Sequence, residues 1–177
     1  MVREMSPSCL IASAGFSGDA DTLHKTLHAR QVTYRHDHGK PMSCQAMSQL
    51  LSNTLYFRRF FPYYTFNLCA GLDNQGKGCV YTYDAVGSFE RTPFSCQGSG
   101  KDLVQPVLDN QLRAVSPLLV PPRGAPVTPL SLTEAIDLVK DCFASAGERD
   151  IFTGDRVEIC IVTAEGIRRE YLDLKLD

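Results

Sequence analysis

The sequence lacks an excess of positive charge and any apolar stretch long enough to cross a membrane. With 18 Lys and Arg against 20 Asp and Glu, the formal net charge is −2, so no basic field is available to attract nucleic acid. No apolar run approaches the ~20 residues of a transmembrane helix, and residues 1–7 contain no apolar signal-peptide core. We therefore expect no nucleic-acid partner, no membrane partner and no targeting signal.

Paired cysteine spacings are also missing. The seven cysteines are an odd number, show no paired CxxC motifs, and lie mostly in apolar runs such as 68–70, 78–80 and 159–161. We interpret them as small buried side chains of a reducing compartment, not as disulfides or zinc ligands. His24 and His28 would share one helical face, but no further ligand is placed to complete a site. The sequence predicts neither a metal site nor a cofactor site.

The 177 residues suffice for one domain, and the composition, with 44% hydrophobic and 21% charged residues, is typical of globular proteins. Apolar periodicity predicts a strand at 9–12, a helix after a glycine-bounded turn at 15–18 that Asp19 or Asp21 caps, and a second helix capped by Ser43. The pattern then predicts strands at 64–71, 78–83 and 89–91, helices at 101–112 and 131–146, and a hairpin at 157–172. Helix pairs separated by antiparallel hairpins favour an α+β sandwich with helices on both sides of the sheets.

Seven of the sixteen aromatic residues lie between Tyr56 and Phe66, interrupted by two arginines and Pro62. Helical spacing would turn these rings to different faces, and Pro62 would end the helix, so part of the run must point outward. Aromatic rings beside arginine are typical of interface cores. The alternative, in which the rings fold back onto the domain's own core, stays open. The interface candidates are Phe57, Arg58, Arg59, Phe60 and Tyr63.

Several of these segments form recognisable motifs: Gly-Phe-Ser-Gly-Asp at 15–19, Leu-Tyr-Phe-Arg-Arg-Phe-Phe-Pro-Tyr-Tyr at 55–64, Tyr-Asp-Ala-Val-Gly-Ser at 83–88, Leu-Asp-Asn-Gln at 108–111 and Glu-Arg-Asp-Ile-Phe-Thr-Gly-Asp at 148–155. Together they span almost the whole chain and resemble the beta subunits of the 20S proteasome, in particular a noncatalytic member. The resemblance implies a four-layer αββα sandwich of the N-terminal-nucleophile hydrolase type, lacking its first strands.

Active members of that family begin with strands that carry an N-terminal threonine nucleophile. The first threonine here is Thr22, inside a predicted helix, and an internal threonine has no free α-amine to act as its base. We therefore expect no catalytic residue. We hypothesise that residues 1–177 form a single, N-terminally truncated domain, with residues 1–4 as a non-native leader and a proline-rich loop at 115–129.

Ser99, Asp150 and Thr153 match family positions that support the terminal threonine in active subunits. Without the nucleophile, we expect Ser99 to cap a helix, and Asp150 with Thr153 to close a turn through bonds from side chain to backbone.

The resemblance implies a noncatalytic structural subunit of the proteasome β ring, in the complex that carries out ubiquitin-dependent protein degradation. Its partners would be other proteasome alpha and beta subunits, and its location the cytoplasm and nucleus. Two alternatives remain: an active threonine-type endopeptidase subunit, and a free-standing scaffold domain with the same fold.

Overall fold

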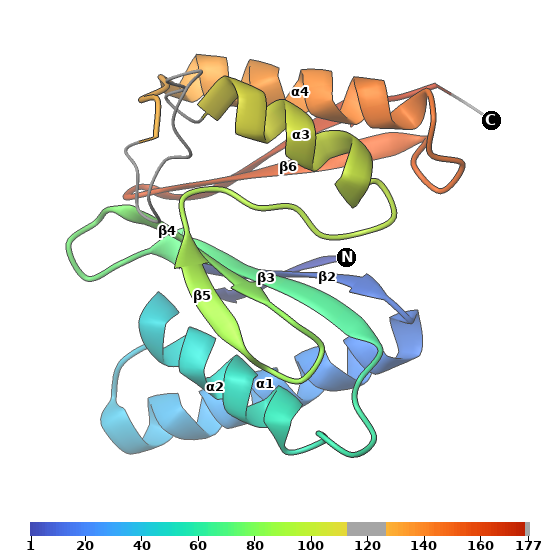
Figure 1. Cartoon of the computed structure of the whole chain (residues 1–177). Helices are drawn as coiled ribbons and strands as arrows, with labels where there is room; N and C mark the ends of the chain where they lie inside the picture. The colour runs from blue at the N-terminus through green and yellow to red at the C-terminus, as the bar shows by residue number, and fades with distance from the viewer. Residues whose placement is uncertain (113–126, 176–177) are drawn as a thin grey trace, which may run out of the picture. The chain divides into compact units, whose positions relative to one another are not determined.

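The computed structural model describes residues 1–112 and 127–175, which belong to two compact units. Unit 1 comprises Met1–Gly98 with Cys160–Arg169, and unit 2 comprises Ser99–Ile159 with Glu170–Asp177. The elements in chain order (Figure 1) are β1 (Val2–Ser6), β2 (Cys9–Gly15), α1 (Ser17–His38), α2 (Cys44–Tyr56), β3 (Thr65–Leu72), β4 (Gly78–Tyr83), β5 (Phe89–Thr92), α3 (Lys101–Leu112), α4 (Leu132–Gly147), β6 (Arg156–Thr163) and β7 (Gly166–Asp173). The single domain over residues 1–177 stays a prediction.

Unit 1 is built on a sheet in which β1 to β5 are neighbours in sequence order, and each pair is antiparallel. Helices α1 and α2 cover one face of this sheet (Figure 1). The strands show the expected period of two: in β3 the side chains of Thr65, Asn67 and Cys69 are buried, whereas Phe66 between them is exposed. The buried residues of the strands and of the two helices therefore form one core.

That core mixes aliphatic, aromatic and thiol side chains. Its fully or nearly fully buried members are Met5, Cys9, Ile11, Leu23, Leu27, Met42, Cys44, Met47, Leu51, Leu55, Tyr63, Cys69, Cys79, Tyr81 and Tyr83. The hydroxyl of Tyr83 donates a hydrogen bond of 2.7 Å to the Ser48 carbonyl, so its polar end is satisfied although the ring is buried.

The expected leader at residues 1–4 is not separate from the fold, because Val2, Arg3 and Glu4 begin strand β1. β1 pairs with β2 through Val2 with Ala12, Arg3 with Ile11 and Glu4 with Leu10, and Met5 enters the core with 5% of its surface exposed. Glu4 also accepts two hydrogen bonds from Arg169.

The start of α1 differs from the expected cap. Neither aspartate caps the helix: Phe16 occupies the N-cap position without a side-chain bond. Asp19 instead accepts the backbone N–H of Tyr64 (2.9 Å), and the Phe16 N–H donates to the Tyr64 carbonyl (2.9 Å). Gly15 permits this approach, because its φ is +125° and a Cβ atom there would lie 2.4 Å from the Tyr64 carbonyl oxygen.

Unit 2 contains the neighbouring helices α3 and α4 (Figure 1). α3 continues through Pro106, and α4 begins with the predicted capping box, in which Ser131 and Glu134 exchange bonds from side chain to backbone. β6 and β7 form a two-stranded sheet, whose residues near the turn belong to unit 1 and whose remaining residues belong to unit 2. The expected loop at 115–129 lies outside the described residues except for 127–129.

Within the described part of the chain, every helix is too short or too polar to span a lipid bilayer.

Candidate functional site

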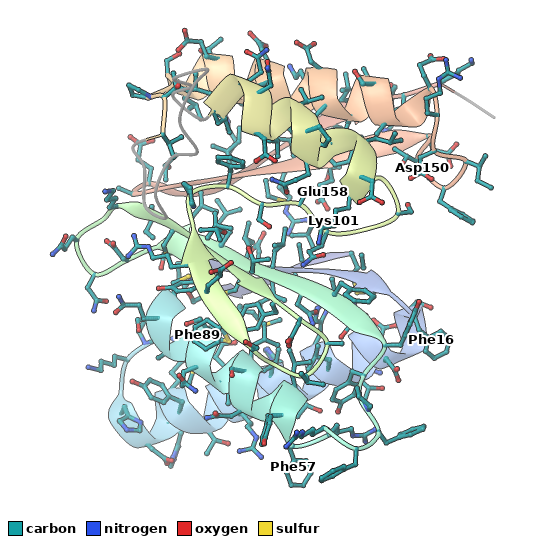
Figure 2. All side chains as sticks on the ribbon, viewed as in Figure 1. Phe16, Phe57, Phe89, Lys101, Asp150 and Glu158 are labelled. Carbon is teal, nitrogen blue, oxygen red and sulfur yellow. The ribbon has the colours of Figure 1, made fainter. Side chains whose placement is uncertain are left out.

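The most exposed apolar surface of unit 1 is the turn that follows α2. We call residues 57–61 the aromatic turn. Its phenylalanines are almost entirely accessible, with exposed fractions of 90% for Phe57, 96% for Phe60 and 81% for Phe61. Figure 2 shows the Phe57 side chain pointing away from the unit. Isolated apolar residues on a surface are ordinary, but three large rings within five residues form a patch of the kind that binds another protein.

The aromatic turn is held in shape by its own backbone and by its arginines. Backbone N–H groups of Arg58, Arg59 and Phe61 donate to carbonyls three residues earlier, at 3.0–3.1 Å. The Arg59 guanidinium donates to the Tyr56 hydroxyl (3.0 Å) and lies 5.8 Å from the centre of the Phe60 ring. The rings are therefore presented by an ordered turn, which lowers the entropic cost of binding a partner.

Tyr63 does not belong to this surface. Only 5% of it is exposed, its ring packs in the core of unit 1, and Arg58 lies over that ring at 4.6 Å. The prediction that Tyr63 contacts a neighbouring subunit is therefore wrong in this structure. The alternative reading holds for Tyr63, whose ring returns to the core, whereas the turn faces outward and its contact with a partner stays a prediction.

Unit 2 brings Ser99, Asp150 and Thr153 together. The Ser99 and Thr153 hydroxyls each donate to Oδ2 of Asp150 at 2.7 Å, and the Phe152 N–H donates to Oδ1 at 3.2 Å. These hydrogen bonds lower the pKa of Asp150, and the bond from Ser99 has the largest effect. The expected turn at Asp150 and Thr153 is confirmed. Ser99 is not the helix cap, because the carbonyl of Gly100 accepts the first hydrogen bonds of α3. Ser99 instead connects the start of α3 to the loop after α4 through its bond to Asp150.

The Asp150 carboxylate is a poor general base, because both of its oxygens already accept hydrogen bonds and its pKa is lowered. Beside it, Ile151 and Phe152 are 82% and 81% exposed, so the same loop carries a second apolar surface.

A buried Ser–His–Asn group in unit 1 resembles a catalytic group, but its hydrogen bonds run in the wrong direction for catalysis. Ser13 donates to Oδ1 of Asn67 (2.7 Å), so Nε2 of His24, 2.8 Å from the same hydroxyl, must carry the proton and donate. The imidazole therefore cannot take a proton from Ser13 as a general base. Nδ1 of His24 is buried without a partner, and burial, followed by Arg3 and the N-terminal amine, lowers the pKa of His24 to about 4.

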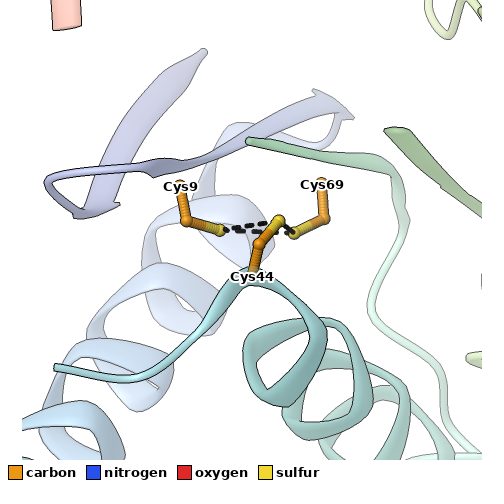
Figure 3. A group of neighbouring side chains, drawn as sticks. All are labelled: Cys9, Cys44 and Cys69. Atoms are coloured by element: carbon orange, nitrogen blue, oxygen red, sulfur yellow. Dashed lines mark hydrogen bonds between the residues drawn. The ribbon is translucent and has the colours of Figure 1, made fainter. Parts of the chain in front are cut away.

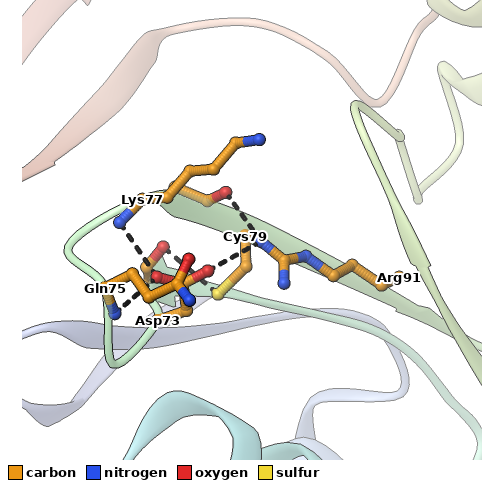
Figure 4. A network of polar contacts seen from close by, with 7 residues as sticks. Asp73, Gln75, Lys77, Cys79 and Arg91 are labelled. Carbon is orange, nitrogen blue, oxygen red and sulfur yellow. Dashed lines mark hydrogen bonds and ion pairs between the residues drawn. The ribbon is translucent and has the colours of Figure 1, made fainter. Parts of the chain in front are cut away.

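A polar network on β3, β4 and β5 holds the hairpin turn at 73–77 (Figure 4). Asp73 accepts the N–H groups of Gln75 (2.9 Å) and Lys77 (3.0 Å) with one oxygen and the Arg91 guanidinium (3.0 Å) with the other. These hydrogen bonds lower the pKa of Asp73, and the bond from the Lys77 N–H has the largest effect. The groove beside it, with a volume of about 700 Å³, is lined by residues that include Asp73, Lys77 and Arg91. Asp73 and Arg91 form an ion pair at 3.0 Å in this groove, so their charges offset each other.

The structure also gathers three cysteines that are far apart in sequence. Cys9, Cys44 and Cys69 are each fully buried, and their sulfur atoms lie within 4.8 Å of one another. Among the described residues, these three cysteines form the group of metal-ligating side chains that lie close enough together to hold a metal ion. His24 and His28 are not part of such a group among those residues. Sequence spacing did not predict this cluster.

Comparison with known proteins identifies the family. A family model described as "Proteasome subunit" matches residues 2–162, most of the chain. The chain belongs to the proteasome subunit family. It is 63% identical over 176 residues to a protein named "Proteasome subunit beta type-1" from Oryza sativa subsp. japonica, covering 99% of this chain and 79% of the relative. The identity is 56% to the beta type-1 subunit of Arabidopsis thaliana, covering 99% and 78%, and 39% to "Proteasome subunit beta type-6" of Saccharomyces cerevisiae, covering 99% and 75%.

Membership of the proteasome family confirms the predicted α+β class and the N-terminal-nucleophile hydrolase fold. The match from residue 2 onward also includes β1, so this strand is part of the family domain.

Proposed function

We propose that this proteasome subunit is a noncatalytic, structural member of the β ring, which contributes to assembly of the complex that degrades ubiquitin-tagged proteins. The observation that carries the proposal is the aromatic turn: an ordered turn with three phenylalanines at least 81% exposed. Leaving these rings in water is unfavourable, and burying each of them against a neighbour would contribute about 1.5–3 kcal/mol. The proposed partners are other proteasome alpha and beta subunits, with Phe57, Arg58, Arg59 and Phe60 as contact residues.

The chemistry of the described residues supports a noncatalytic role. The Asp150 carboxylate is saturated by Ser99, Thr153 and a backbone N–H group, and His24 donates to Ser13 instead of accepting from it. Within residues 1–112 and 127–175, these two hydroxyl-bearing clusters are organised to hold elements together. The beta type-1 names of the most similar relatives reported above point the same way.

We place the subunit in the cytoplasm and nucleus. This placement rests on the odd number of cysteines and on their positions in apolar runs, which fit a reducing compartment.

Native sizing of a tagged chain tests the proposal. We expect the tagged full chain, expressed in cells, to migrate with a particle of several hundred kilodaltons. Migration as a free chain would favour the scaffold alternative and contradict a structural role in the ring.

Peptidase assays on the isolated chain test the second part. We expect no hydrolysis of fluorogenic peptides and no adduct with threonine-directed covalent inhibitors. A labelled residue in this chain, located by mass spectrometry, would establish the endopeptidase alternative.

A further inference from the structure

Three buried cysteines of unit 1 point to a binding site separate from the surfaces described above. Cys9 lies on β2, Cys69 on β3 and Cys44 at the first position of α2, and Figure 3 shows their thiols directed toward one another. The sulfur atoms of Cys9 and Cys44 are 3.5 Å apart, those of Cys9 and Cys69 3.6 Å, and those of Cys44 and Cys69 3.9 Å. No pair is a disulfide.

These distances match those of sulfur atoms that share a metal ion. For tetrahedral coordination with bonds of about 2.3 Å, ligand sulfurs are about 3.8 Å apart. The observed triangle has a circumradius of about 2.1 Å, so an ion at about 2.3 Å from each sulfur would lie about 0.9 Å from their plane. The three side chains are thus already in position for coordination.

We propose that Cys9, Cys44 and Cys69 form a binding site for a thiophilic cation, Cu⁺ or Zn²⁺. Thiolate ligands select these ions over Mg²⁺ or Ca²⁺. Binding releases the thiol protons to solvent, about three for each ion, as the three sulfur–metal bonds form. The site contains no residue of the aromatic turn.

One feature of the fold favours a thiolate in this cluster. Cys44 begins α2, whose N-terminal N–H groups and dipole stabilise negative charge. Gly71 packs closely beside the cluster, because a Cβ atom there would lie 2.1 Å from the Ser8 carbonyl oxygen and 3.0 Å from the Cys44 sulfur.

Cys79 lies outside this group. It faces Gly71 on the next strand, and its thiol donates to the Gly71 carbonyl at 3.4 Å. Structural Zn²⁺ almost always has four ligands, so a site of three sulfurs fits Cu⁺ more closely than Zn²⁺. The two ions are therefore separate arms of the test.

The test uses the full 177-residue chain, reduced and refolded under argon with either Zn²⁺ or Cu⁺ supplied as its glutathione complex. After desalting, we expect about one ion per chain for at least one of the two metals by elemental mass spectrometry. The Cys44→Ala and Cys69→Ala variants should lose this ion, whereas Cys142→Ala, which removes a buried thiol of α4 in unit 2, should retain it. Retention of neither metal, or equal loss in Cys142→Ala, would overturn the proposal.

Two measurements on the unmodified chain keep the test decisive if a variant fails to fold. X-ray absorption at the metal edge should show sulfur ligands only, at least three for each ion. Alkylation followed by peptide mapping should show that the metal protects Cys9, Cys44 and Cys69 and that a chelator removes the protection. Nitrogen or oxygen ligands without sulfur, or protection of other cysteines alone, would contradict the assignment.

Discussion

The aromatic run allows one experiment to separate assembly from folding, because neighbouring rings have opposite environments. Phe60 is 96% exposed and Tyr63 is 5% exposed, although they are three residues apart. Replacing Phe60 by Ala removes a ring that contacts solvent and the exposed Arg59 guanidinium. We expect the free energy of unfolding of the isolated chain to change by less than about 0.5 kcal/mol.

Tyr63→Ala is the matched control. It removes a ring from the core of unit 1 together with its contact to Arg58 at 4.6 Å. Truncation of a buried aromatic residue costs about 3–5 kcal/mol, because apolar burial is lost and a cavity remains. Urea unfolding followed by circular dichroism should therefore separate the two variants clearly.

Incorporation into the particle should be affected by the Phe57→Ala/Phe60→Ala double variant instead. If each ring contributes about 1.5–3 kcal/mol when an interface buries it, the pair contributes about 3–6 kcal/mol. This corresponds to a loss of about two to four orders of magnitude in the affinity of the contact. Differently tagged wild-type and double-variant chains, co-expressed at equal levels, should give purified particles that contain mainly the wild-type tag.

Two results would refute this reasoning. Equal incorporation of both tags would show that the aromatic turn is not an interface. A loss of more than about 1 kcal/mol in the stability of the isolated double variant would show that the turn supports the unit's own fold.

Most of the fold could be predicted because the chemistry of its elements is local. The alternation in β3 and β4 and the capping box of Ser131 with Glu134 are visible within a few residues of sequence. β1 gave no such signal. Its charged residues Arg3 and Glu4 find their partners in Asp21 and Arg169, far away in the sequence, and its register with β2 is irregular between Glu4 and Ser6.

The candidate sites were predictable only where one segment carries them. The composition of the aromatic run indicated exposure, but the separation of Phe60 from Tyr63 depends on the turn geometry and on the anchoring of Tyr64 by Asp19 and Phe16. The cysteine cluster could not be read from spacing, because Cys9 and Cys44 are 35 residues apart and Cys69 is 60 residues from Cys9. Only the pairing of Ile11 with Cys69 and the position of α2 bring the thiols together.

Three further substitutions test individual interactions. Asp150→Ala should speed limited proteolysis of the loop at 148–155 relative to the wild type, since Ser99 and Thr153 lose their common acceptor; unchanged cleavage rates would contradict this role. Tyr83→Phe should lower the free energy of unfolding by about 1–2 kcal/mol in urea, because a buried hydrogen bond to the Ser48 carbonyl is lost. His24→Gln should remove part of the acid sensitivity of the fold. Since the pKa of His24 is about 6.5 in the unfolded chain and about 4 in the folded one, the unfolded state binds the proton first, and wild-type stability should fall as the pH decreases from about 6.5 to about 4. The contribution of this single proton is at most about 1.4 kcal/mol per pH unit and vanishes above that window. The free energies of unfolding of wild type and His24→Gln should therefore differ by an amount that changes with pH. A difference that stays constant from pH 7 to pH 4 would show that His24 is not buried in its neutral form.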